Sequence, residues 1–123
     1  MTFEEFRQFC KAKPGVTEEM PFGPDVMVYK VVGKMFALHS ISAEPEQVSL
    51  KCDPDLADEL RRNHQDIIPG YHLNKRHWNT IVKRGNLPIE LMHMMTDHSY
   101  DLVVKKLKKI DRDKLRLAKQ SQD

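Results

Sequence analysis

Apolar residues near both ends of the chain recur every three or four positions, and this spacing predicts amphipathic helices. The N-terminal set consists of Phe3, Phe6, Phe9 and Cys10. Thr2 and Glu5 have the spacing of a capping box, so this helix should begin directly after Thr2. Pro14 and Gly15 should end it, because both residues disfavour a helix interior.

A second helical pattern begins after Pro88 and extends over about six turns. Its apolar residues are Leu91, Met92, Met95, Leu102, Val103, Leu107 and Ile110. The pattern predicts one long helix, followed after Asp111 by a short basic helix whose last residues, 121–123, should fray. Met92 and Met95 lie on the apolar stripe, so we interpret them as core residues rather than as a metal or cofactor feature.

Between these helices, segments that are rich in β-branched residues or that alternate strictly predict strands. Residues 26–32 and 35–40 should form a hairpin through a type II′ turn at Gly33-Lys34. Residues 47–52 alternate between apolar and polar side chains. This alternation predicts a strand with one face in water.

Asp53 and Pro54 mark the start of a further helix, as N-cap and first helical residue. Residues 66–69 are interpreted as a connector, and residues 78–84 as another strand. A chain of 123 residues, 40% of them hydrophobic, suits a single domain over residues 1–123. The elements predict an α+β fold, in which an antiparallel sheet is flanked by helices mainly on one face and offers its other face to solvent or a partner.

Charge and cysteine content set only loose limits on function. The chain has 20 cations and 18 acids, a formal charge of +2, which permits an anionic partner without requiring one. Cys10 and Cys52 are far apart and in no metal-binding spacing, so both should be reduced and at least partly buried. No apolar run approaches the roughly 20 residues that span a bilayer, and acids near the N-terminus are unlike a signal peptide. We expect a cytoplasmic protein.

Signatures of common enzyme classes do not occur: the sequence has no GxSxG, P-loop, GxGxxG or HExxH motif. His93 and His98 are five residues apart on a predicted helix, so they point in different directions. His72 and His77 would face opposite sides of an extended segment. We therefore expect no metal site and no cofactor, and predict that the protein is not an enzyme.

The segment PGYHLNKRHWNTI, residues 69–81, combines the only tryptophan with histidines, asparagines and adjacent cations. In a purely structural interpretation, Tyr71 and Trp78 are core wedges, while Asn74 and Asn79 stabilise turns. The cations within and after the segment are harder to explain in this way, because neighbouring positive charges repel one another unless an anion is near.

Phosphate groups would suit these residue types, since arginine, lysine and histidine all donate to phosphate oxygens. The candidate phosphate contacts are Lys75, Arg76, His77, Lys83 and Arg84, with Lys34 and Lys51 as further candidates. The basic run at residues 105–109 is interpreted instead as a solvated helix end, where cations are favoured by the helix dipole.

The same segment, with three others, resembles the MmcQ/YjbR family over almost the whole chain. The other three are PFGPDVMVYKVVGKMFAL (21–38), VSLKCDPDLADELR (48–61) and LPIELMHMMTDHSYDLV (87–103). The resemblance implies a fold similar to the CyaY (frataxin) class and DNA binding in a double-wing arrangement. The residues that match its most specific motif are His72, Asn74, Lys75, His77, Trp78 and Thr80, whereas Arg76 is variable.

Two features separate this chain from what the resemblance implies. Lys83-Arg84-Gly85 stands where the family is expected to have a neutral or acidic pair before glycine. The swap favours an anionic partner, or it marks a loop under no functional constraint. The iron handling of the frataxin class would need clustered carboxylates, but the first helix offers only Glu4 and Glu5.

Two functional hypotheses remain open. The first is a monomer that binds duplex DNA without catalysis. The alternative is an interaction module that binds a protein or small ligand through the polar sheet face and the motif, with Tyr71 and Trp78 as aromatic anchors.

Overall fold

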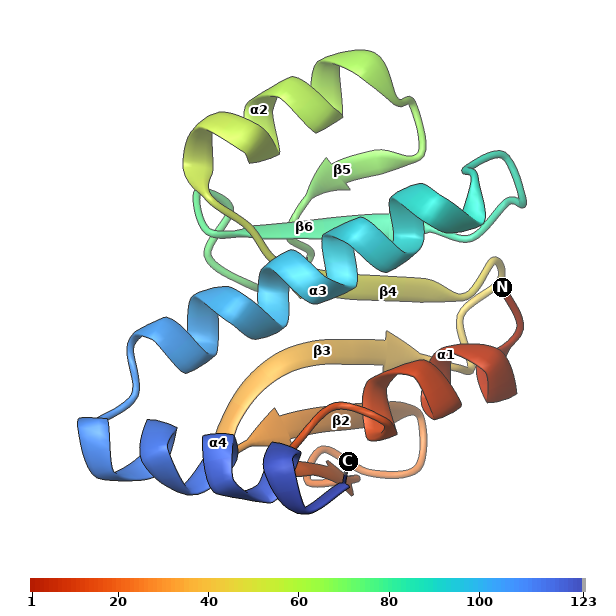
Figure 1. Ribbon diagram of the computed structural model, residues 1–123. Coiled ribbons are helices and arrows are strands. Elements are labelled where there is room, and N and C mark those ends of the chain that lie inside the picture. The colour runs from red at the N-terminus through yellow and green to blue at the C-terminus, as the bar shows by residue number, and fades with distance from the viewer. Residues whose placement is uncertain (123) are drawn as a thin grey trace.

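The computed structural model describes residues 1–122, and side chains through residue 119. The strands are β1 (Val16–Glu19), β2 (Val26–Val31), β3 (Lys34–Ser40), β4 (Gln47–Lys51), β5 (Ile67–Pro69) and β6 (Trp78–Val82). The helices are α1 (Phe3–Lys11), α2 (Pro54–Asn63), α3 (Ile89–Lys105) and α4 (Lys109–Gln122). The strands form one sheet in the order β1-β2-β3-β4-β6-β5, in which every neighbouring pair is antiparallel (Figure 1).

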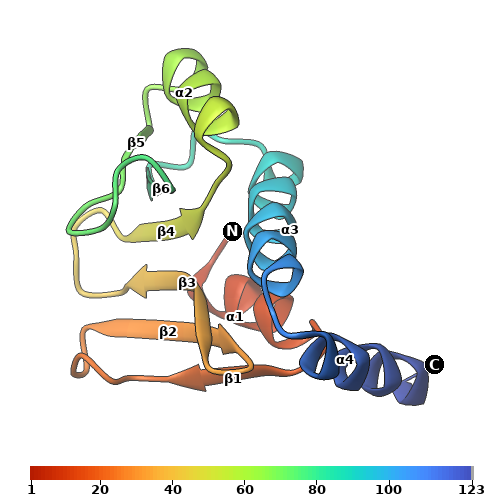
Figure 2. The same ribbon diagram turned by 90° about the vertical axis from the view of Figure 1, so that its left-hand side faces the viewer.

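The helices lie mainly on one face of this sheet, as the sequence predicts. Figure 2 shows α1, α3 and α4 on the same side, while α2 lies beyond the β5 edge. α3 crosses β2, β3 and β4, and α1 packs on β1. The α+β class and the one-sided arrangement are therefore confirmed. The opposite face carries loops and no helix from the described part of the chain.

The hydrophobic core fills the space between the helices and the sheet. Phe6 from α1 meets the edge of the Tyr29 ring, with ring centroids 5.8 Å apart. Met92 and Met95 are buried in this core, so their interpretation as core residues is confirmed. Other buried members are Cys10, Val31, Phe36, Ala37, Val48, Leu50, Cys52, Ile81 and Val103.

Both cysteines are free and buried, as expected. Burial raises the pKa of the Cys52 thiol to about 11, and it also raises the pKa of Cys10. Neither thiol is therefore a reactive thiolate near neutral pH.

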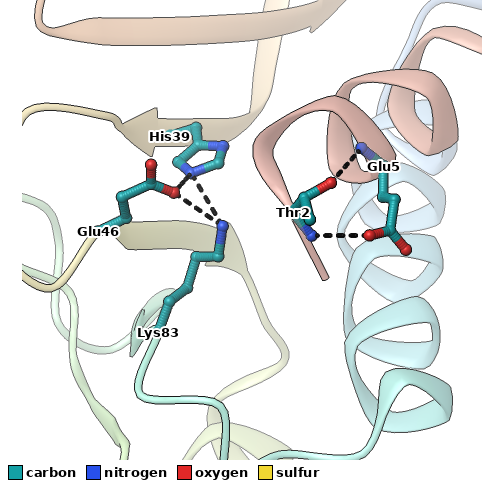
Figure 3. Close-up of polar contacts among 5 residues, drawn as sticks. All are labelled: Thr2, Glu5, His39, Glu46 and Lys83. Carbon is teal, nitrogen blue, oxygen red and sulfur yellow. Dashed lines mark hydrogen bonds and ion pairs between the residues drawn. The ribbon is translucent and has the colours of Figure 1, made fainter.

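Both predicted caps are present. The Thr2 hydroxyl accepts from the Glu5 N–H, and the Glu5 carboxylate accepts from the Thr2 N–H, which completes the capping box (Figure 3). Asp53 caps α2 through a bond from the Asp55 N–H, and Pro54 is the first helical residue. Each cap satisfies backbone donors that the helix itself leaves free.

Local strand details differ from the predictions in three ways. The strand predicted over residues 78–84 ends at Val82. β1 and β5 were not predicted, because they are only four and three residues long and lack a clear alternating pattern. The hairpin turn is centred on Val32-Gly33, not on Gly33-Lys34. Both central residues have positive φ, 48° and 74°, which makes the turn type I′ rather than type II′.

The long helix predicted after Pro88 is shorter than expected, because it was predicted to include Leu107 and Ile110, and the basic helix that follows it starts at Lys109 and not after Asp111. α3 ends at Lys105, where tight bonds from the Lys106 and Leu107 N–H groups to carbonyls three residues earlier close its last turn. α4 then starts in a new direction (Figure 2), and Ile110 is 63% exposed instead of belonging to the apolar stripe. The new direction buries Leu115 close to Gly15. Residues 121–123 were expected to fray, but their side chains and the whole of residue 123 lie outside the described part of the chain.

The face of β4 that was expected to be wet is closed at its centre. Ser49 is buried, and its hydroxyl lies 2.8 Å from the hydroxyl of Thr80, which is also buried. β4 is an internal strand between β3 and β6, and the chain after β5 folds onto this side, where the Tyr71 N–H donates to Thr80 Oγ1 over 2.9 Å. The polar face of β4 is therefore not continuous, and the interaction-module hypothesis loses the surface that it would use.

Candidate functional site

Residues 70–77, which join β5 to β6, form a loop fixed by its own polar groups. Asn74 Oδ1 accepts from the Arg76 N–H at 2.9 Å, and Lys75 Nζ donates to the Gly70 carbonyl at 2.9 Å. A Cβ at Gly70 would stand 2.8 Å from Trp78 Cβ, so only glycine fits this position without a shift of its neighbours. The loop is therefore a defined piece of structure.

Arg61, on the last turn of α2, holds this loop to the sheet. Its Nε donates to Asn79 Oδ1 at 2.7 Å, and its Nη2 donates to the carbonyls of Trp78, at 3.1 Å, and of Lys75. Sequence reasoning missed this residue, because the partners lie 14 to 18 residues away and no local pattern links them. The guanidinium fork suits the task, since one rigid group can satisfy several acceptors.

The predicted structural roles in the motif are confirmed in part. Trp78 is only 7% exposed, so it is a core wedge and not a stacking surface. Asn74 stabilises the turn as predicted, but the turn role of Asn79 is wrong, because its side chain is buried against Arg61. The core role predicted for Tyr71 is also wrong, since its side chain is 60% exposed. The outward-facing residues of the loop are Tyr71, His72, Asn74, Lys75 and Arg76.

The seven predicted phosphate contacts fall at two opposite ends of the sheet. We call the end where β3 and β6 begin and β4 finishes the basic end; it carries Lys34, Lys51, Lys75, Arg76 and His77. We call the opposite end, where β4 begins and β6 finishes, the paired end; it carries Lys83 and Arg84. The predicted contacts therefore do not form one cluster.

At the paired end both cations have internal partners. Lys83 Nζ lies 2.8 Å from Glu46 Oε2, and Arg84 Nη1 lies 2.6 Å from Asp66 Oδ1. The Arg84 hydrogen bond lowers the pKa of Asp66, and a second bond from Asn86 acts in the same direction. Lys83 and Arg84 thus balance carboxylates of this chain, a role that the sequence did not predict.

The Lys83 pair extends to a buried histidine, as Figure 3 shows. His39 is fully buried against the rings of Phe3 and Phe6, and its Nε2 lies 2.9 Å from Glu46 Oε2. Burial lowers the pKa of His39, which keeps the ring neutral at neutral pH. Burial opposes ionisation of Glu46, but the hydrogen bonds from Lys83 and His39 outweigh it and lower that pKa.

At the basic end the lysines converge without such partners. Lys34, Lys51 and Lys106 line one groove of about 310 Å3 whose apolar part is formed by Val103 and Leu107. Burial, and then the charges of Lys106 and Lys34, lower the pKa of Lys51. Within residues 1–119, no carboxylate forms an ion pair with any of these three ammonium groups. The groove has the charge of an anion site.

Lys106 was not among the predicted contacts. It belongs to the basic run at residues 105–109, which the sequence presents as an ordinary solvated helix end. The turn between α3 and α4 brings this one lysine over the start of β3 and the end of β4. Only the break in the predicted long helix could have indicated that position.

The histidines on α3 are engaged in packing and capping. His93 stacks on Phe9, with ring centroids 4.1 Å apart, and His98 Nε2 accepts from the Asp53 N–H at 3.1 Å. Over the described residues, no three histidine, cysteine or acidic side chains are grouped to hold a metal ion. No helix in that part of the chain is both long and apolar enough to cross a membrane.

Comparison with known proteins identifies the family. The family model described as YjbR matches residues 11–102. The chain belongs to the YjbR family. The resemblance predicted from the sequence is thus confirmed, and the matched range includes the sheet, α2, the loop at residues 70–77 and most of α3.

Relatives of this YjbR-family chain match it over most of their length. It is 38% identical over 104 residues to Escherichia coli K12 "Uncharacterized protein YjbR", which covers 85% of this chain and 88% of that protein. It is 34% identical over 96 residues to "Uncharacterized protein YbdF" of Escherichia coli O157:H7, and this match covers 78% of this chain and 79% of that protein.

Solved structures are also similar. The crystal structure of Deinococcus radiodurans protein DR2400 matches with a TM-score of 0.86 and 42% identity, over 93% of this chain and 87% of that one. A Pseudomonas syringae protein gives a TM-score of 0.72 at 27% identity, over 83% of this chain and 98% of that one. These names assign no activity, so a function has to be inferred from the site itself.

Proposed function

We propose that this YjbR-family protein binds DNA without a chemical step, through phosphate groups held at the basic end of the sheet. The observation that carries the proposal is the convergence of Lys34, Lys51 and Lys106 on one groove, where no carboxylate of residues 1–119 pairs with them. Arg76 and Lys75, on the adjacent loop, extend the positive surface toward β6.

The contrast with Lys83 and Arg84 supports this assignment. Where this chain uses cations for its own fold, it supplies Glu46 and Asp66 as partners. Three ammonium groups around one groove repel each other, and the pKa of Lys51 is lowered by burial and, to a smaller extent, by that repulsion. A phosphate group would relieve the repulsion, because its oxygens accept from several donors at once.

The proposal is of binding and not of catalysis, because the motif residues already serve the fold. Asn79 and Thr80 are buried and hydrogen-bonded, and Lys75 Nζ is tied to the Gly70 carbonyl. The exposed remainder of the loop contains donors for phosphate oxygens rather than a nucleophile beside a base.

The test is fluorescence anisotropy of a labelled DNA of mixed sequence, single-stranded and duplex, titrated with protein between about 50 and 200 mM salt. We expect binding that weakens steeply with salt. The variant Lys34→Gln/Lys51→Gln should bind more weakly and reduce the log-log salt slope by about 1 to 2, since each phosphate contact contributes about 0.7 to 0.9.

The matched control is Lys11→Gln/Lys114→Gln, which removes the same charge from exposed positions on α1 and α4. It should leave the affinity close to that of wild type. Absence of binding to either DNA form at the lowest salt would contradict the proposal, and so would equal losses in the two double variants.

A further inference from the structure

Tyr71 and His72 form an exposed aromatic pair on the loop before β6. Their ring centroids are 4.0 Å apart, and the Tyr71 side chain is 60% exposed. Tyr71 has no side-chain hydrogen bond to the described part of the chain. Packing within the fold therefore does not explain why two adjacent rings stand in solvent.

The backbone beneath the pair is rigidly placed. The Tyr71 N–H donates to Thr80 Oγ1, and Thr80 is in turn bonded to Ser49, so the platform is tied to two internal strands. His72 has a φ of 60°, a left-handed conformation that a residue other than glycine seldom adopts. Backbone strain held at an exposed position by surrounding bonds is a common property of binding loops.

The pair also lies close to the basic end. Thr80, under Tyr71, is two residues along β6 from Trp78, a distance of about 7 Å in a strand. Trp78 is paired with Lys51, whose Nζ is 6.0 Å from the centre of the indole ring. An extended ligand could thus place an aromatic group on Tyr71 and an anionic group beside Lys51.

We infer that the nucleic acid bound here is single-stranded, with a base stacked on the Tyr71–His72 pair and its phosphates at the basic end. This inference rests on the proposed function and narrows its substrate. Bases in a duplex are stacked on each other and offer no free face, whereas an unpaired base stacks readily on an exposed aromatic ring. Cations that follow the backbone beside such a ring are the usual arrangement of single-strand sites.

The experiment compares four labelled ligands of equal length: an oligo-dT strand, an oligo-rU strand, an abasic strand with the same phosphates, and a duplex. Wild type should bind the strands with bases more tightly than the abasic strand and the duplex. Tyr71→Ala should weaken binding to those strands by on the order of 5- to 100-fold, the usual value of one base–aromatic stack, and leave the abasic strand and the duplex unaffected. Tyr71→Phe should keep most of the affinity.

The control is Phe22→Ala, which removes an equally exposed aromatic ring, 62% accessible, from the β1–β2 connection beside the paired end. It should bind like wild type. The inference would be overturned if Tyr71→Ala bound oligo-dT and oligo-rU as wild type does, or if wild type preferred the duplex; either result would leave the proposed function intact. Failure to bind any of the four ligands would contradict both this inference and the proposed function.

Discussion

The two ends of the sheet use the same residue types for different purposes. At the paired end, Lys83 and Arg84 lie within 2.8 Å of carboxylate oxygens of the same chain. At the basic end, Lys34 and Lys51 share a groove with a third lysine and no carboxylate partner among the described residues. A cation in the sequence therefore indicates little about its role until its partner is known.

The physical difference is one of compensation. A partly buried ammonium group beside a carboxylate recovers part of the hydration energy that it loses, so the pair stabilises the fold relative to either group alone. Ammonium groups gathered around a groove recover nothing from each other, and the fold is stable in spite of them. Such a site remains in a protein at a small cost in stability, which a bound anion removes.

The largest expected effect concerns Arg61, a cation near the basic end that has a structural role. Arg61→Leu should lower the free energy of unfolding by about 2 to 4 kcal/mol, because it leaves the Asn79 side chain and two carbonyls without their donor. Urea unfolding followed by the fluorescence of Trp78, the only tryptophan, measures it. Arg61→Lys should recover less than half of the free energy of unfolding that Arg61→Leu loses, since one ammonium group cannot replace the guanidinium fork. An unchanged free energy of unfolding in Arg61→Leu would show that the loop at residues 70–77 does not depend on Arg61.

Lys83 should come next, because its removal leaves Glu46 and His39 without a cation. Lys83→Met should destabilise the protein by roughly 1 to 3 kcal/mol. The matched variant at the other end, Lys34→Met, should change stability by less than about 0.5 kcal/mol. Equal losses in the two variants, by the same urea assay, would erase the distinction between the ends.

The pH dependence of stability should report the buried histidine of the paired end. Burial lowers the pKa of His39 from its ordinary 6.5, so below pH 6.5 the unfolded chain binds a proton that the folded chain resists. This contribution to stability is present above pH 6.5 and is lost as the pH falls from 6.5 toward the folded pKa. We expect the free energy of unfolding, measured with urea, to decrease as the pH falls from about 7.5 to 5.5.

His39→Gln is the control for this prediction, since the amide does not titrate. Its unfolding free energy should depend less on pH over the same interval. Glu46 does not interfere, because its pKa is lowered from 4.5 and it titrates below this range. A pH profile as steep in the variant as in wild type would assign the dependence to other groups.

The smallest effect on stability should come from Lys51. Lys51→Gln should leave the free energy of unfolding unchanged, or raise it by up to about 0.5 kcal/mol, because it relieves repulsion with Lys34 and Lys106. The same change should weaken binding of DNA. Thermal unfolding with and without a short oligonucleotide measures both, and a clear loss of stability without ligand would mean that Lys51 has a structural partner.

The sequence predicts those parts of the fold whose signals are local. The capping box at Thr2, the N-cap at Asp53 and the apolar stripe around Met92 and Met95 each depend on residues within a few positions of one another. β1 and β5 carry no such signal, because pairing with a neighbour defines strands of this length. The break between α3 and α4 contains neither glycine nor proline and depends on where Leu115 packs.

The candidate site could be predicted only as a set of residue types. Lys83 and Glu46 are 37 residues apart, so their pairing is invisible to any local pattern. The same holds for Lys106, which the sequence groups with its neighbours in a solvated run and the fold places with Lys34 and Lys51. The sequence identifies these residues as cations. Their division between the two ends of the sheet follows from the sheet topology.

The most direct test of the two-end account is a backbone amide chemical-shift map of the 15N-labelled protein titrated with an oligo-dT strand at low salt. The account predicts shifts that cluster at Lys34, Lys51, residues 71–77 and Lys106, with residues 83–86 and Glu46 unchanged. Shifts centred on Lys83 and Arg84, or shifts spread evenly over every exposed cation, would contradict it.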